Sequence, residues 1–82
     1  MKLVIECDVS QRRGGVSATA RQLGLTGHGH DRDAALASLR RAAAAWAMGL
    51  TLAGRLAEAL GRRGVRCEDK DSEGWVIDLR VA

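Results

Sequence analysis

The sequence predicts an α+β fold, a two-layer sandwich in which an antiparallel sheet of about four strands carries one or two helices on one face. Two observations lead to this prediction. Alternating polar and apolar residues at both ends of the chain are typical of half-buried strands, and apolar residues between them recur at helical spacing. The 82 residues form a single domain, residues 1–82, because a chain of this length cannot support two separate cores.

The N-terminal part predicts a β-hairpin. The segment KLVIECDVS, residues 2–10, places every second side chain on one face: Leu3, Ile5, Cys7 and Val9. QRRGG then supplies two glycines that suit a tight turn, and VSATARQL, residues 16–23, alternates again. The next segment, LGLTGHGH, is rich in glycine and suits a short third strand or a turning loop.

Residues 23–39, LGLTGHGHDRDAALASL, are interpreted as a junction between a strand and a helix. Asp31 is placed to cap the helix N-terminus, and the glycines that precede it allow the backbone to reverse in a small space: Gly24, Gly27 and Gly29. One helix is expected from about residue 32 to 48. Gly49 and Thr51 offer a break and a second cap, so residues 32–63 form either two helices or one bent helix.

The C-terminal part predicts a second hairpin. VRCE is short and extended, DKDSEG is a polar turn, and WVIDLRV alternates again. Its apolar face consists of Trp75, Ile77, Leu79 and Val81. The opposite face, with Val76, Asp78 and Arg80, then lies on the side of the sheet that the helices leave uncovered.

Neither a metal site nor a catalytic site is predicted. His28 and His30 could share a metal ion with Asp31 or Asp33, but the chain has no other histidine, and Cys7 and Cys67 are assigned to the core. Both histidines are therefore expected to be solvent-facing loop residues. Nucleophilic catalysis would need a hydroxyl held by a base and a third group, which Ser17, Thr19 or Thr26 beside His28 would provide only by accident. We expect no enzyme activity and no cofactor.

The charge leaves two classes of partner open. The formal net charge is +3, and the basic residues considered as candidate contacts lie in two clusters, Arg12–Arg13 and Arg62–Arg63–Gly64–Val65–Arg66. These five arginines could contact the phosphates of RNA or DNA. Acidic residues in CEDKDSEGW follow the second cluster and offset its field, and the chain has no Phe or Tyr for base stacking. Nucleic-acid binding is therefore the alternative hypothesis.

The stretch GLTGHGHDRDAAL resembles the HicB-type antitoxin family. The matching positions are Gly24, Gly29, Asp31, Asp33, Ala35 and Leu36. The resemblance covers the partner-binding domain only, and no appended DNA-binding module is expected. It implies a non-catalytic protein that binds a partner, usually a small RNA-cleaving toxin, and masks its active surface. An orphan of this kind could instead serve as an accessory subunit that supports an enzyme complex.

The expected partner is therefore a protein, either a toxin-like RNase or an enzyme subunit. Unpaired strand edges of a small sandwich could bind another chain, and a homo-oligomer is expected, most simply a two-fold dimer. The predicted interface consists of Val76, Asp78, Arg80 and Arg21. MKLVIECD is too short and too acidic for a signal peptide, and no apolar run reaches the roughly 18 residues of a membrane span, so a cytoplasmic location is expected.

Overall fold

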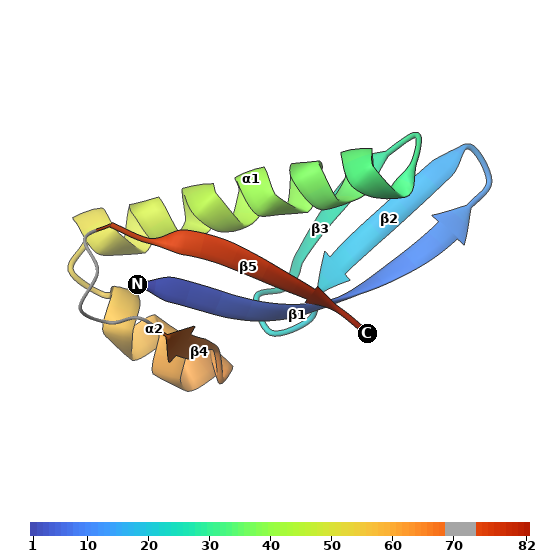
Figure 1. Ribbon diagram of the computed structural model, residues 1–82. Helices are drawn as coiled ribbons and strands as arrows, with labels where there is room; N and C mark the ends of the chain where they lie inside the picture. The colour runs from blue at the N-terminus through green and yellow to red at the C-terminus, as the bar shows by residue number, and fades with distance from the viewer. Residues whose placement is uncertain (69–73) are drawn as a thin grey trace.

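The computed structural model of the protein describes residues 1–68 and 74–82 (Figure 1). Five strands and two helices follow one another in the order β1 (Lys2–Arg12), β2 (Gly15–Ala20), β3 (Leu25–Gly29), α1 (Arg32–Leu52), α2 (Leu56–Arg63), β4 (Arg66–Glu68) and β5 (Val76–Val81). The helices pack on a single sheet. The predicted α+β two-layer sandwich is confirmed, with five strands in the described residues where about four were expected.

Strand β1 lies at the centre of the sheet and pairs with three other strands. Its C-terminal half pairs antiparallel with β2, from Asp8↔Thr19 to Arg12↔Gly15, and β2 pairs antiparallel with β3. Its N-terminal half pairs with β4, antiparallel, and with β5, parallel. Because Lys2, Leu3 and Val4 of β1 are aligned with residues of both β4 and β5, these two strands must lie on opposite edges of β1.

The predicted second hairpin is wrong. β4 and β5 do not pair with each other; each pairs with β1 instead, and β5 runs parallel to it. Alternation of apolar residues indicates which face of a strand is buried but does not specify its neighbour, and β1 offered two free edges. Residues 69–73 of the polar segment DKDSEG, which were expected to form the turn of this hairpin, lie outside the described residues.

Helix α1 packs directly on β3 because two glycines of that strand have no side chain. A Cβ added to Gly27 would lie 2.3 Å from the backbone nitrogen of Leu39, and one added to Gly29 would lie 2.5 Å from the Cβ of Ala34. Only Gly24 of the three junction glycines has a positive φ, +67°. The interpretation of Gly27 and Gly29 as turn residues was therefore wrong: they belong to β3 and permit close approach of the helix.

The start of α1 was predicted correctly, and its end was not. Asp31 caps the helix, accepting a hydrogen bond of 2.8 Å from the backbone nitrogen of Ala34. The helix continues past Gly49, and the Thr51 hydroxyl donates to the Ala47 carbonyl oxygen within α1 instead of capping a second helix. Residues 53–55 separate α1 from α2, so the chain has two helices here. None of the described helices is long and apolar enough to cross a membrane.

One apolar cluster lies between the sheet and the helices. Its largest fully buried side chains are Leu3, Ile5 and Leu39, and many of the others are alanines, so the layers approach closely. Cys7 is buried in the cluster, where loss of hydration raises the pKa of its thiol. Trp46 is half-buried at its margin, and so are Cys67 and Trp75, which are less enclosed than the sequence predicted.

The contact between α1 and β3 can be tested with a pair of glycine substitutions. Gly27→Ala should lower the free energy of unfolding by at least about 2 kcal/mol, because the added methyl group meets helix backbone that cannot move independently. The control is Gly49→Ala in the exposed part of α1, where no atom lies within 4 Å of the added Cβ. This change should raise the free energy of unfolding by about 0.5–1 kcal/mol. Urea denaturation measures the free energy of unfolding of both variants. Equal changes in the two variants would contradict the close contact between α1 and β3.

Candidate functional site

The side chains of β1 and β5 that point away from the core share one face of the sheet, called here the outer face. The register sets Val4 beside Asp78, Glu6 beside Arg80, and Asp8 beside Thr19 of β2. Glu6, Val76 and Arg80 are exposed on it. Three residues of the predicted interface, Val76, Asp78 and Arg80, thus lie on this face in β5, as their alternation indicated.

Charges of both signs are paired on and around the outer face. Arg80 Nε donates to Asp78 Oδ2 at 2.8 Å, and this hydrogen bond raises the pKa of the Arg80 guanidinium. Arg21, the fourth predicted interface residue, lies just after β2 with its Nε 3.0 Å from Asp8 Oδ2. Lys2 and Glu68 approach to 4.0 Å. Opposite charges therefore alternate along the face, and no field of a single sign develops there.

Two valines add apolar surface to the outer face. Val76 is 63 % exposed at the start of β5, and it is one of the few large apolar side chains that the described residues leave in solvent. Val4 is only 4 % exposed, although it points away from the main core. Its neighbours in the register are Arg66 of β4 and Asp78 of β5, so strands enclose Val4 on both sides.

Gln22 is a structurally important residue that the sequence did not single out. On this edge of β1, pairing with β4 ends at Val4 and pairing with β2 starts at Asp8. The backbone of Glu6 therefore faces a gap between the two strands. Gln22 Oε1 accepts a hydrogen bond from the Glu6 nitrogen at 3.2 Å, and its Nε2 donates to the Gly64 carbonyl oxygen at 2.8 Å. One amide thus joins the end of β2, β1 and the approach to β4.

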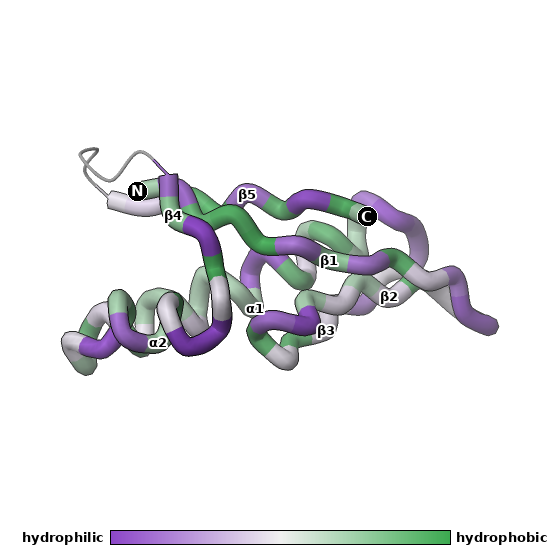
Figure 2. Tube along the Cα trace, turned by 90° about the horizontal axis from the view of Figure 1, so that it is seen from below, coloured by the Kyte–Doolittle hydropathy of each residue, from purple (hydrophilic) through white to green (hydrophobic). Residues whose placement is uncertain are grey.

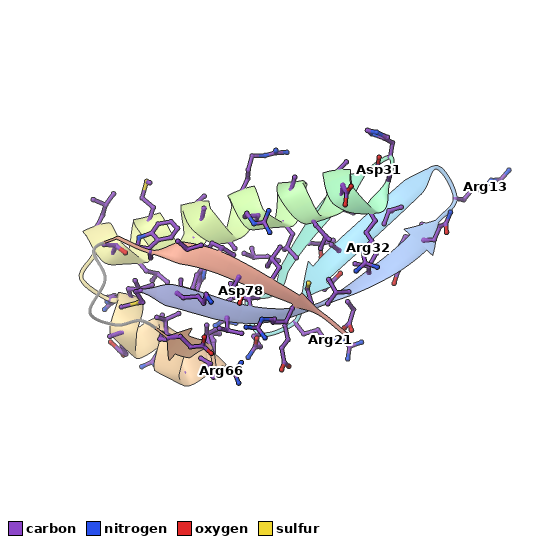
Figure 3. The ribbon with its side chains drawn as sticks, in the orientation of Figure 1. Arg13, Arg21, Asp31, Arg32, Arg66 and Asp78 are labelled. Atoms are coloured by element: carbon purple, nitrogen blue, oxygen red, sulfur yellow. The ribbon has the colours of Figure 1, made fainter. Side chains whose placement is uncertain are left out.

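The two arginine clusters lie at opposite ends of the molecule. Figure 3 shows Arg13 at the tip of the β1–β2 hairpin and Arg66 at the other end, beside α2. Within the second cluster Arg62 pairs with Glu58 at 2.9 Å, and Arg66 pairs with Glu68 at 3.6 Å. The five arginines of the alternative hypothesis therefore do not form one continuous basic surface.

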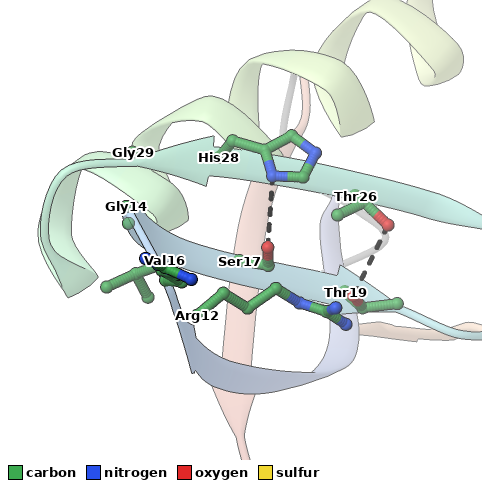
Figure 4. Close-up of a pocket in the computed structure, with 10 residues that line it drawn as sticks. Arg12, Gly14, Val16, Ser17, Thr19, Thr26, His28 and Gly29 are labelled. Carbon is green, nitrogen blue, oxygen red and sulfur yellow. Dashed lines mark hydrogen bonds between the residues drawn. The ribbon is translucent and has the colours of Figure 1, made fainter.

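A polar cavity of about 340 Å³ opens on β1, β2 and β3 near the hairpin tip (Figure 4). Arg12 and Arg13 line it together with the hydroxyl groups of Ser17, Thr19 and Thr26 and the ring of His28. None of its lining residues is acidic. A positive charge surrounded by hydroxyl donors is suited to a tetrahedral oxyanion such as phosphate.

The structure brings Ser17 and His28 together, although no such pair was predicted from the sequence. Ser17 Oγ lies 3.1 Å from His28 Nδ1, and Ser17 is only 5 % exposed. His28 belongs to β3 and not to a loop, because the glycine-rich segment pairs with β2. Among residues 1–68 and 74–82, no carboxylate holds the imidazole, so the third group of a nucleophilic triad is not provided.

The other predicted ligand residues are spread out. His30 is exposed and its Nε2 lies 3.3 Å from Asp31 Oδ2, while Asp31 also caps α1. Within the described part of the chain, no group of three or more His, Cys, Asp or Glu side chains is arranged to hold a metal ion.

Comparison with models of known protein families, with curated proteins and with solved structures found no match to this chain.

The hydrogen bond between Ser17 and His28 predicts different roles for the two histidines. His28→Ala should lower the free energy of unfolding by about 1 kcal/mol, because it removes the partner of a buried hydroxyl. His30→Ala is the control and should change it by less than about 0.5 kcal/mol, since its ion pair is exposed. Denaturation at pH 8 measures both, and a His28 variant as stable as the His30 variant would contradict the assignment.

Proposed function

We propose that the protein is a cytoplasmic, non-catalytic protein-interaction module that binds a partner protein, and itself, through the outer face and the adjoining edge of β5. The observation that carries this proposal is the paired, mixed charge of the outer face, together with an exposed valine at the start of β5. Charges of both signs in a fixed arrangement give specificity for one complementary surface, and an exposed apolar side chain beside them adds contact area.

The resemblance to HicB-type antitoxins supplies the class of partner. A small RNA-cleaving toxin is the first choice, and the module would mask its active surface. The second choice is a subunit of an enzyme complex, which the module would support as an accessory protein. In either case the partner's surface would carry an acidic and a basic group spaced to meet Arg80 and Asp78, which lie two residues apart on β5.

A second candidate function, binding of RNA or DNA phosphates, is favoured by one specific observation. The cavity beside Arg12 combines basic and hydroxyl side chains without a carboxylate, as a phosphate site would. The separation of the two arginine clusters and the pairing of Arg62 and Arg66 with glutamates weaken this candidate, because a long polyanion is held by a continuous basic track.

Reversal of the charges on the outer face distinguishes the two functions. The tagged protein is purified from its native cells with its bound proteins, which are identified and quantified by mass spectrometry. Asp78→Arg combined with Arg80→Glu should remove the specific partner by at least about tenfold, because the partner's own charges are unchanged. Arg12→Ala combined with Arg13→Ala is the matched control, a double change at an exposed site away from β5, and should retain the partner.

The opposite pattern would support the second function. If the arginine double variant loses binding, the β5 double variant keeps it, and a single-stranded 20-nucleotide RNA competes for the site, the interaction-module proposal is wrong. The RNA affinity of wild-type protein, measured by fluorescence anisotropy at two salt concentrations, completes the comparison, since phosphate contacts weaken steeply with salt.

A further inference from the structure

The edge of β5 that faces away from β1 is a run of backbone hydrogen-bonding groups that a second chain could use. Figure 2 shows β5 along the margin of the sheet, with β1 on its inner side and no described element beyond it. β5 pairs with β1 alone among the described strands. Such an edge is a template for another strand.

The hydrogen bonds to β1 determine which backbone groups of β5 face outward. The backbone nitrogens of Val76 and Ala82 donate to the carbonyl oxygens of Met1 and Cys7. Neighbouring residues of a strand direct their backbone groups to opposite edges, so the even-numbered residues from 76 to 82 face β1. The odd-numbered residues Ile77, Leu79 and Val81 therefore direct their N–H and C=O groups to the open edge.

From this geometry we infer that β5 pairs antiparallel with β5 of a second copy of this chain, on a two-fold axis that passes beside Leu79. In this register Leu79 meets the same residue of the copy, and Ile77 meets Val81 of the copy. All of these are residues whose backbone groups face outward, so each pair exchanges two hydrogen bonds, about six in total. A shift by one residue would leave the outward groups of one strand without partners.

The side chains agree with the same register. On the outer face, Asp78 of each chain lies directly opposite Arg80 of the other, so two ion pairs form across the axis. On the helix side, Leu79 and Val81 are half-buried at the margin of the core, and a second strand would cover them. The stretch Ile77–Asp78–Leu79–Arg80–Val81 is thus self-complementary in both charge and apolar character, which is what an isologous contact requires.

This inference rests on the proposed function, because it names the second copy as one occupant of the β5 edge. It extends the sheet from five strands in one chain to a continuous sheet of ten across the dimer. The outer face of such a dimer would present two copies of the mixed-charge surface side by side, both available to a partner protein.

Charge reversals at two positions test the register. Wild-type protein should elute with twice the mass of one chain in size-exclusion chromatography with light scattering at micromolar concentration. Asp78→Arg places arginine opposite arginine, and Arg80→Asp places aspartate opposite aspartate, so each variant alone should be a monomer. An equimolar mixture of the two single variants should form a heterodimer in native mass spectrometry, because both cross-axis pairs are then opposite in charge. The double variant, Asp78→Arg with Arg80→Asp, should again form a homodimer.

Circular dichroism of each single variant shows whether it has folded, and recovery of the dimer on mixing is itself proof that both are native. A monomeric wild-type protein, or single variants that remain dimers, would overturn the inference.

Failure of this inference can be distinguished from failure of the proposed function. The double charge reversal should preserve the homodimer and yet lose the partner protein, whose own charges are not reversed. A dimer that responds as expected while partner binding is unaffected would contradict only the proposed function.

Discussion

Hydrogen bonding of β1 on both of its edges is the constraint on which the rest of this structure depends. Its even-numbered residues face β4, Gln22 and β2 in succession, and its odd-numbered residues face β5. Every other strand is positioned by this one, directly or through β2. Because both edges of β1 are occupied, the edges that pair with no other described strand belong to β3, β4 and β5. Of these, β4 has only three residues, and β3 lies under α1.

The thinness of the core follows from the contact between α1 and β3. Glycines on the strand and alanines on the helix, such as Ala35 and Ala43, bring the two backbones close together, which leaves little volume for large side chains. A chain of 82 residues with few aromatic side chains has a small reserve of hydrophobic stabilisation. Leu79 and Val81 remain half-exposed at the margin of β5. Burial of these two side chains under another chain would add to the hydrophobic stabilisation of the protein.

Much of the fold could be predicted from the sequence because its signals are local. The cap at Asp31, the tight hairpin turn and the alternation in β1, β2 and β5 each involve residues close together in the chain, and all are present. The pairing of β5 with β1 could not be predicted, because partner choice depends on contacts across more than seventy positions. The role of Gly27 and Gly29 was missed for the same reason, since their neighbours in α1 are visible only once the helix is placed. Alternation identified the face that carries Asp78 and Arg80, whereas the cavity beside Arg12 and the bridging amide of Gln22 depend on strand register.

Amide hydrogen exchange along β5, followed by NMR at a high and a low protein concentration, tests most directly whether this strand is the edge of association. The amides of Asp78, Arg80 and Ala82 face β1, so they should be protected at both concentrations. The amides of Ile77, Leu79 and Val81 should be protected at the high concentration and should lose that protection on dilution. If these three outward amides exchange as rapidly as those of an exposed loop at every concentration, β5 is an unpaired edge and this account of its association is wrong.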